Sequence, residues 1–135
     1  MKYFTIAELT RSATASARGI DNTPAQSHID NLRALVDNVL DPLRQAWGKP
    51  LTVNSGYRCP ALNRAVGGAA ASQHLLGQAA DITAGSPADN RRLMQLCTDL
   101  RLPFDQLIDE SDFTWLHISY HHPDKCRNAV IGLSE

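Results

Sequence analysis

The stretch that decides the fold is Ser72–Asp81, which reads SQHLLGQAAD. His74 and Asp81 stand seven residues apart in it, and on one continuous helix they would lie about 10.5 Å apart along the axis. Zinc ligands bond at about 2.0–2.2 Å, so the two residues cannot share both a helix and a metal. Gly77 lies between them, where a turn would let Asp81 return on a strand beside His74. The alternative is that His74 caps a helix and Asp81 pairs with a surface Lys or Arg.

Upstream of this stretch, apolar residues recur at helical spacing. Asn22-Thr23-Pro24 combines a cap with proline at the first helical position, and it predicts a core helix that ends before Gly48. Pro42 lies inside the pattern and predicts a kink near Leu40-Asp41. Thr5–Glu8 has the form of a capping box and predicts a short helix at the start. The apolar stripe of the core helix consists of Ile29, Leu32, Val36, Val39, Leu43 and Trp47.

Shorter elements follow Gly48. Residues 60–66 are expected to form one or two helical turns, and Ser86-Pro87 caps a further helix that Pro103 ends. Strands are expected at residues 51–54, 79–83, 104–110 and 114–120, the last two forming a β-hairpin. With helices first and the hairpin last, the order predicts an α+β fold whose small, mostly antiparallel sheet packs against helices.

Composition limits the classes of partner. The chain has 135 residues, of which 43% are hydrophobic and 20% charged, and this suits a single domain over residues 1–135. Thirteen Lys+Arg against fourteen Asp+Glu give a net charge of −1 at pH 7, so neither nucleic acid nor an acidic membrane surface is an expected partner. A monomer is expected. Cys59, Cys97 and Cys126 form no C-x-x-C pair and are expected to be free thiols.

We expect neither a membrane span nor a signal peptide in this sequence. No run approaches the roughly 18 apolar residues of a membrane span, and Glu8 stands where a signal peptide would have its apolar stretch. The expected location of the protein as made is therefore the cytoplasm.

A second polar segment, Trp115–Ser119, places His117 36 residues after Asp81. On a strand the odd-numbered residues of this segment share one face. If Glu110 pairs with Trp115 across the hairpin, Glu110 becomes a diagonal neighbour of His117 at roughly 7–8 Å. That distance suits a carboxylate that reaches a water on a metal without ligating the metal. A register shifted by one residue would turn Glu110 to the opposite face.

Two histidines and an aspartate are a typical zinc ligand set. Three protein ligands leave the fourth position of zinc open, which is typical of hydrolytic rather than structural sites.

Three segments closely resemble the M15 family of zinc D-Ala-D-Ala carboxypeptidases and related peptidoglycan endopeptidases. They are Asn54–Asn63 (NSGYRCPALN) followed by Gly67-Gly68, then Ser72–Ile82, then Trp115–Ser119 (WLHIS). The resemblance covers most of the chain, and its core pattern is S-x-H-x-x-G-x-A-x-D followed downstream by W-x-H. It implies the hedgehog/DD-peptidase-like fold.

The same resemblance implies the site and the activity. His74, Asp81 and His117 would bind Zn²⁺, and Arg58 would be the cation that steadies the scissile carbonyl or the substrate carboxylate. The implied function is hydrolysis of peptidoglycan stem-peptide amide bonds involving D-amino acids, by a carboxypeptidase or an endopeptidase. The alternative is a non-catalytic zinc-containing module that binds muropeptides or has a structural role. Without a signal peptide, the chain would suit a phage or prophage lysin released to the cell wall, or a cytoplasmic recycling enzyme.

One position departs from the family pattern. Many members carry the catalytic acid three residues before the last histidine, where this chain has Thr114, and threonine cannot act as the base. Residues 104–111 resemble the hedgehog-like variant, in which a glutamate ends the preceding strand. Glu110 is therefore the expected general base, with Asp112 and Asp109 as substitutes. The other interpretation of Glu110 is a solvated turn acid.

Three cleft residues keep two interpretations each. Arg58 is expected to bind substrate, or else to pair with Asp81 or a helix C-terminus. Ser72 is expected near the substrate but is better suited to capping a short helix than to nucleophilic catalysis, since no base stands at the required spacing. Trp115 shares the His117 face and is expected to line the metal cleft, or else to pack in the core.

The remaining histidines are weaker candidates. His121 and His122 follow the strand end and are expected to be exposed, with contact to substrate at the cleft rim as the alternative. His28 lies one residue before the helix stripe and is expected to be solvated.

Overall fold

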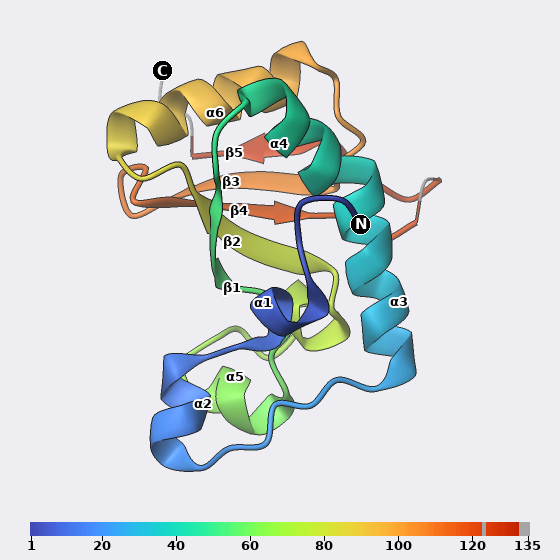
Figure 1. Ribbon diagram of the computed structural model, residues 1–135, viewed down its shortest axis with the longest axis vertical. Coiled ribbons are helices and arrows are strands. Elements are labelled where there is room, and N and C mark those ends of the chain that lie inside the picture. Colours follow the sequence, from blue (N-terminus) through green and yellow to red (C-terminus); the bar gives the residue numbers. More distant parts are fainter. Residues whose placement is uncertain (123, 133–135) are drawn as a thin grey trace.

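The computed structural model describes residues 1–122 and 124–132 (Figure 1). Within these residues the strands form one sheet in the order β1-β2-β4-β3-β5. They span Thr52–Ser55 (β1), Ala79–Thr83 (β2), Gln106–Glu110 (β3), Trp115–Ser119 (β4) and Ala129–Ile131 (β5). All neighbouring strands are antiparallel except β3 and β5. The predicted α+β class with a small, mostly antiparallel sheet is confirmed.

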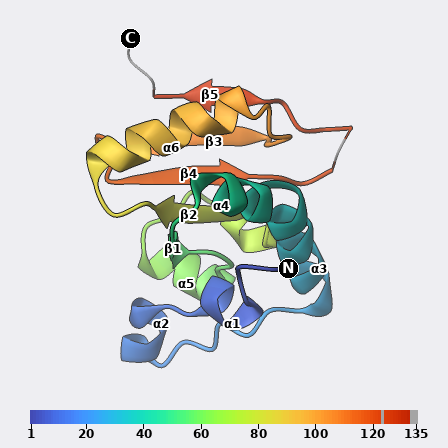
Figure 2. The same cartoon turned by 45° about the horizontal axis from the view of Figure 1, so that its top comes forward.

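Helices cover one face of this sheet. In Figure 2, α4 (Asp41–Trp47) and α6 (Pro87–Asp99) lie over the strands, and the two helices contact each other. Leu107, Leu116 and Ile118 are fully buried in the core. The other helical segments are α1 Ile6–Thr10, α2 Ala13–Arg18, α3 Gln26–Leu35, the π-helical turn η1 Val36–Leu40, α5 Pro60–Ala65 and the 3₁₀ turn η2 Gln73–Leu76. Because strand side chains alternate between faces, the residues next to Leu107, Leu116 and Ile118 along their strands point to the other side of the sheet.

The predicted core helix forms as an uninterrupted run of α3, η1 and α4, from Gln26 to Trp47. Pro42 has no N–H to donate to the carbonyl four residues earlier, so the regular α-helical pattern cannot pass through it. The helix adjusts with a π-helical turn, in which Asp41 N–H donates to the Val36 carbonyl. The sequence predicts a kink near Leu40-Asp41, and the structure has a π-helical turn that begins about one turn earlier, at Val36.

The predicted start of this helix at Asn22-Thr23-Pro24 is wrong, because α3 begins at Gln26. The Asn22 side chain does not cap the helix. Its Nδ2 donates to the carbonyls of Thr10 (2.8 Å) and Tyr57 (3.0 Å), and its Oδ1 accepts from Cys59 N–H (2.7 Å). These long-range hydrogen bonds tie the N-terminal segment to the chain that carries Arg58.

The hairpin has the register on which the placement of Glu110 depends, and the register shifted by one residue is not the one present. Glu110 lies opposite Trp115, and Ile108 lies opposite His117. Its turn is tight, because Ser111, Asp112 and Phe113 all have positive φ angles of 49°, 54° and 64°. Phe113 is nevertheless buried, which anchors the turn to the core.

Two elements were not predicted. The helix α2 follows a serine cap, in which Ser12 accepts from Ala15 N–H at 3.2 Å, yet its sequence has little apolar periodicity. The strand β5 is only three residues long and pairs in parallel with β3. Long-range contacts to Asp105, described below, hold the chain that leads into β5.

Two further features are the state of the cysteines and the length and apolar character of the helices. Cys59, Cys97 and Cys126 are free thiols, as expected, and burial raises the pKa of Cys97 to about 12. Among the helices of residues 1–122 and 124–132, none combines the length and apolar character of a membrane-spanning segment.

Candidate metal centre

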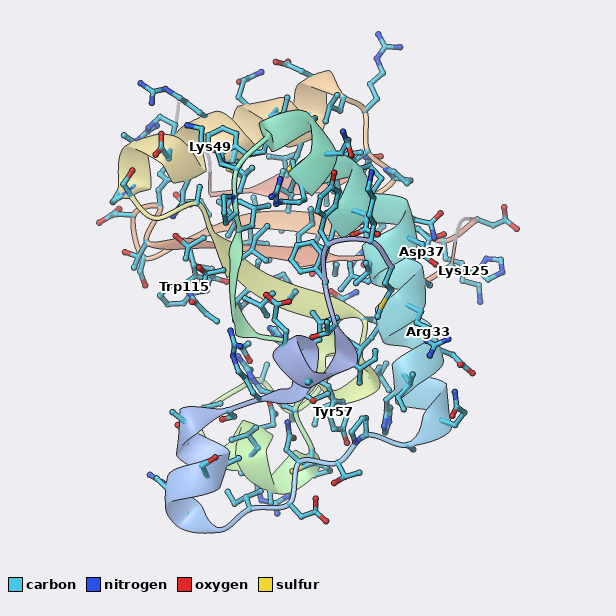
Figure 3. The ribbon with its side chains drawn as sticks, in the orientation of Figure 1. Arg33, Asp37, Lys49, Tyr57, Trp115 and Lys125 are labelled. Atoms are coloured by element: carbon cyan, nitrogen blue, oxygen red, sulfur yellow. The ribbon has the colours of Figure 1, made fainter. Side chains whose placement is uncertain are left out.

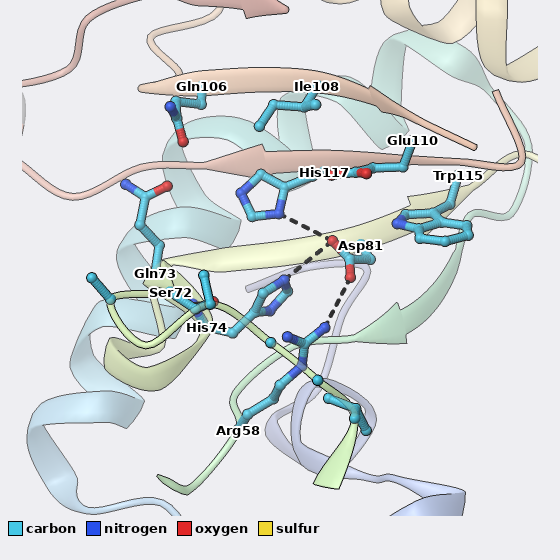
Figure 4. Close-up of a pocket in the computed structure, with 15 residues that line it drawn as sticks. Arg58, Ser72, Gln73, His74, Asp81, Gln106, Ile108, Glu110, Trp115 and His117 are labelled. Carbon is cyan, nitrogen blue, oxygen red and sulfur yellow. Dashed lines mark hydrogen bonds and ion pairs between the residues drawn. The ribbon is translucent and has the colours of Figure 1, made fainter. Parts of the chain in front are cut away.

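Three metal-ligating side chains meet on the face of the sheet opposite α4 and α6. His74 belongs to η2, Asp81 to β2 and His117 to β4. His74 Nε2 lies 3.2 Å from Asp81 Oδ1, and His117 Nδ1 lies 3.1 Å from the same oxygen (Figure 4). The ligand atoms of all three residues lie within 4.8 Å of one another. The structure thus brings together the three residues that the sequence predicts as metal ligands.

The turn at Gly77 creates this arrangement. Ser72 caps η2 by accepting a hydrogen bond from His74 N–H at 3.2 Å, and Gly77 ends the segment with a φ of 73°. A Cβ at Gly77 would lie 2.6 Å from the His28 carbonyl oxygen, so another residue would be both strained and crowded. The chain then returns as β2, where Asp81 pairs directly with His117 of β4. The expected reversal between His74 and Asp81 is confirmed.

A backbone carbonyl orients the imidazole of His74. Its Nδ1 lies 2.7 Å from the Gly56 carbonyl oxygen, which can only accept, so Nδ1 carries the proton. Nε2 is then the nitrogen that faces Asp81 and is left to bind a metal. Gly56 itself packs so closely on the Leu9 backbone that no Cβ fits there, and Tyr57 N–H donates to the same Leu9 carbonyl at 2.8 Å.

Asp81 is buried and ionised. Burial alone would raise the pKa of Asp81, but hydrogen bonds with His117 and His74 outweigh burial and hold it well below its usual range. Its second oxygen, Oδ2, accepts from Arg58 Nη2 at 3.3 Å. One buried carboxylate and two imidazole nitrogens, all pointing to one spot, form a donor set that fits a zinc ion.

Arg58 is held on three sides. Its Nε donates to Ser55 Oγ at 3.0 Å, Nη1 to Asn63 Oδ1 at 3.3 Å, and Nη2 to Asp81. The pairing with Asp81, which was one of the two interpretations of Arg58, is present. The guanidinium also lines the cleft above the metal-ligand group, so this pairing does not remove it from the reach of a ligand.

A cleft of about 470 Å³ opens over the metal-ligand group (Figure 4). Glu110, Trp115 and Ser72 all line it, as the sequence predicts. Trp115 is half-buried and so forms part of the wall rather than of the core. The cleft also has polar lining that sequence reasoning did not single out, namely Gln73, Gln106 and the backbone of Gly67–Ala69.

Among the three acids considered as the base, Glu110 is the one that lines the cleft. Asp109 points elsewhere, since its Oδ1 accepts from Phe113 N–H at 2.6 Å and so closes the hairpin turn. Asp112 is exposed within that turn, and so is Thr114, whose hydroxyl donates to the Ser111 carbonyl. The alternation of the strand accounts for this result, because Asp109 and Glu110 must face opposite sides.

Asn90 is a buried residue that sequence reasoning missed. Its Nδ2 donates to the carbonyls of Phe113 (2.8 Å) and Thr114 (3.1 Å), and its Oδ1 accepts from Ala84 N–H (2.6 Å). It thereby joins the start of α6 to the turn that separates Glu110 from Trp115. The available signal was its position three residues before Leu93, on the apolar face of a predicted helix.

The remaining histidines lie outside the cleft. His122 is exposed as expected, but the same expectation is wrong for His121, which is partly buried with its Nε2 3.8 Å from Asp105 Oδ2. The expectation that His28 is solvated is wrong. Its ring stacks on Tyr57 with the ring centroids 4.6 Å apart, and its Nδ1 accepts from Ala25 N–H at 3.1 Å. Figure 3 shows Tyr57 close to α1.

Comparison with known proteins agrees with this geometry. The zinc D-Ala-D-Ala carboxypeptidase of Streptomyces albus G is 52% identical over 48 residues, which make up 35% of this chain and 19% of that protein. The matched segment therefore spans about a fifth of the relative's length. A sequence model of the family described as Peptidase M15 matches residues 2–119, which include every cleft residue named above. The chain belongs to the peptidase M15 family.

Proposed function

We propose that this M15 peptidase is a zinc enzyme that hydrolyses amide bonds of peptidoglycan stem peptides involving D-amino acids. The observation that carries the proposal is the buried group of His74, Asp81 and His117, which opens into a cleft bearing Glu110 and Arg58. Those five residues supply the functions that peptide hydrolysis at a metal requires: ligation, proton transfer and stabilisation of negative charge.

Zinc is the proposed ion because the donor set consists of two imidazole nitrogens, from His74 and His117, and one carboxylate, from Asp81. A zinc ion held there supplies Lewis acidity, which lowers the pKa of water and polarises an amide carbonyl. The chain's part is to keep the ligands deprotonated and aimed. The Gly56 carbonyl does this for His74, and Arg58 Nη2, which donates to Asp81 Oδ2, does it for the carboxylate.

Glu110 is the proposed general base. It is half-buried at the end of β3, lines the cleft, and forms no side-chain hydrogen bond within the described residues. Its carboxylate is therefore free to accept a proton from a water in the cleft as the water oxygen attacks the amide carbon. When the C–N bond breaks, Glu110 returns that proton to the leaving nitrogen, which departs as a neutral amine.

Arg58 is the proposed electrophilic residue. Hydrogen bonds from Nε to Ser55 and from Nη1 to Asn63 fix its planar guanidinium at the cleft wall. A fixed positive charge there stabilises the oxyanion that forms from the amide carbonyl, or holds a substrate carboxylate in two parallel hydrogen bonds. Trp115 is proposed as an apolar wall for the substrate, and the Ser72 hydroxyl as a polar contact beside it.

The name of the Streptomyces albus G relative, a zinc D-Ala-D-Ala carboxypeptidase, supports the substrate class. Both a carboxypeptidase that removes a terminal residue and an endopeptidase that cuts within the stem fall inside the proposal. Four further expectations stay predictions. They are a single domain over residues 1–135, a monomeric state, a cytoplasmic location and release as a phage or prophage lysin.

Thr114 favours a second candidate function, a non-catalytic zinc module that binds muropeptides. Thr114 stands where many family members carry their acid, and it is exposed in the hairpin turn. This module would share the zinc ligands and the cleft with the enzyme, but not the need for Glu110.

The test that separates the two candidates combines metal analysis with digestion. Protein purified without added metal should contain about one zinc per chain, and it should convert purified muropeptides to products whose masses identify the cleaved bond. Glu110→Gln should keep the zinc and lose the hydrolysis. Zinc and muropeptide binding without any cleavage by the wild type would favour the non-catalytic module.

A further inference from the structure

Gln73 immediately precedes the metal ligand His74 and lines the same cleft. Its Nε2 donates a hydrogen bond of 2.7 Å to Asp105 Oδ2. Asp105 is fully buried at the entrance to β3, so this contact fixes the Gln73 side chain to the sheet. A glutamine amide has one donor end and one acceptor end, and the identity of its partner decides which end faces the cleft.

Arg127 ensures that Asp105 acts only as an acceptor. Its guanidinium donates from Nε to Oδ1 and from Nη2 to Oδ2, both at 2.8 Å, and its backbone N–H donates to Oδ1 at 2.9 Å. Hydrogen bonds from Arg127 hold the pKa of Asp105 well below its usual range, although burial acts in the opposite direction. The carboxylate is therefore ionised and requires the NH₂ end of Gln73. The carbonyl end, Oε1, must then point away from Asp105.

That carbonyl oxygen is an orphan. Gln73 Oε1 is buried and has no hydrogen-bond partner among the described residues. Buried polar atoms without a partner are uncommon because they lose their hydration and gain nothing in return. An orphan acceptor beside a metal-ligand group therefore indicates a donor that becomes available when the site is loaded.

His117 offers such a donor. Its Nδ1 faces Asp81 and is the atom available to a metal. A neutral imidazole that binds a metal through Nδ1 carries its proton on Nε2, and metal-ligating histidines almost always donate this second N–H to an acceptor. His74 already has its acceptor in the Gly56 carbonyl. Within the described residues, His117 Nε2 forms no hydrogen bond, and Figure 4 shows the Gln73 amide on the same side of the cleft as the His117 ring.

We infer that Gln73 is a positioning residue for the metal centre, whose Oε1 accepts a hydrogen bond from His117 Nε2–H when zinc is bound. The inference rests on the proposed function, since it requires a metal at His74, Asp81 and His117. It also extends the centre outward, because Asp105 and Arg127 act on the metal through Gln73. The chain that leads into β5 is thus linked to the zinc ligands.

The test measures zinc affinity by competition with a chromophoric chelator. Gln73→Met keeps the length of the side chain but removes the acceptor, and we expect it to bind zinc about 10–100-fold more weakly than the wild type. The matched control is Gln106→Met, since Gln106 lines the same cleft but its side chain has no hydrogen-bond partner among the described residues. The control should bind zinc as the wild type does.

A second readout follows the proton itself. In the zinc-loaded wild type, long-range ¹H–¹⁵N correlation of the imidazoles should show His117 with a proton on Nε2 that exchanges slowly with water. This exchange should become fast in Gln73→Met and stay slow in Gln106→Met. The wild-type signal decides the question even if Gln73→Met fails to fold.

The outcomes separate the two proposals. A wild type that binds no zinc would overturn the proposed function. A zinc-binding wild type whose His117 Nε2 proton exchanges freely would overturn the role of Gln73 alone. So would equal zinc affinity in wild type and Gln73→Met, or an equal loss in both glutamine variants.

Discussion

Asp81 and Glu110 are two carboxylates on one cleft in opposite surroundings. Asp81 is buried, pairs in register with a metal-ligand histidine and shares its oxygens among His74, His117 and Arg58. Glu110 is half-buried, stands at the end of its strand beside a turn, and forms no side-chain hydrogen bond within the described residues. A ligand must stay deprotonated and still, whereas a base must gain and lose a proton. The environments therefore fit Asp81 for the proposed role of ligand and Glu110 for the proposed role of base.

The largest effect is expected from replacing Asp81, the buried carboxylate. Asp81→Asn removes the charged ligand, and it should abolish stoichiometric zinc binding and all hydrolysis. Chelation should lower the thermal midpoint of the wild type, because the metal binds the folded state, and should leave Asp81→Asn unchanged. Elemental analysis and thermal unfolding with and without chelator measure both effects.

The control for this prediction is His122→Ala, which removes an exposed histidine outside the cleft. It should keep about one zinc per chain. Undiminished zinc in Asp81→Asn would remove that residue from the ligand set.

The next largest effect is expected from replacing Glu110, the half-buried carboxylate. Glu110→Gln keeps the shape of the side chain but cannot accept a proton, so turnover should fall by roughly 10²-fold or more while zinc affinity stays near the wild-type value. Steady-state kinetics on a muropeptide and chelator competition give the two numbers. Asp112→Asn, in the same turn but outside the cleft, should change turnover far less. A Glu110→Gln enzyme at the wild-type rate would refute the assignment.

Arg58 shares the cleft with both carboxylates. It contacts Asp81 and lines the same cleft as Glu110. Arg58→Ala should reduce turnover about 10²-fold, the usual scale for loss of one group that stabilises an oxyanion. Arg58→Lys should restore only part of it, because lysine keeps the charge but not the planar fork. Zinc should remain in both variants, and full activity of Arg58→Ala would leave Arg58 with a structural role only.

The smallest expected effect lies behind the cleft and shows as stability. Asp105→Asn breaks the pair with Arg127, whose side chain is 60% exposed, and should lower the free energy of unfolding by about 1–3 kcal/mol at pH 7. The pKa of Asp105 is lowered in the folded state, so its contribution is complete above the unfolded value of about 3.9 and is lost as pH falls below it. Urea unfolding of both proteins should therefore show a difference that shrinks below about pH 4. A difference that stays constant from pH 7 to pH 3 would contradict the ionised pair.

Local rules were sufficient to predict the parts of the fold where one interaction dominates. The strand Ala79–Thr83 and the cap at Ser86 are present as predicted. The hairpin is also present, in the register that puts Glu110 on the His117 face, which the sequence left open. Long-range contacts account for the failures. Asn22 looks like a helix cap but bonds to Thr10, Tyr57 and Cys59 instead.

The candidate site also has parts that the sequence predicts and parts that it does not. The ligand triad could be predicted from the family resemblance, and spacing showed only that a turn at Gly77 could bring Asp81 back beside His74. The pairing of Asp81 with His117 is a long-range contact that the structure reveals. Two buried contacts around the site do not follow from spacing. Asn90 and Gln73 bond to partners far along the chain, and only the folded structure reveals those partners.

The central claim is that His74, Asp81 and His117 hold one zinc ion. Anomalous diffraction at the zinc absorption edge, from crystals of protein purified without added metal, tests it most directly. We expect a single strong peak per chain, within about 2.0–2.2 Å of His74 Nε2, an Asp81 carboxylate oxygen and His117 Nδ1. A zinc peak at any other residues, or none in a protein that hydrolyses muropeptides, would contradict it.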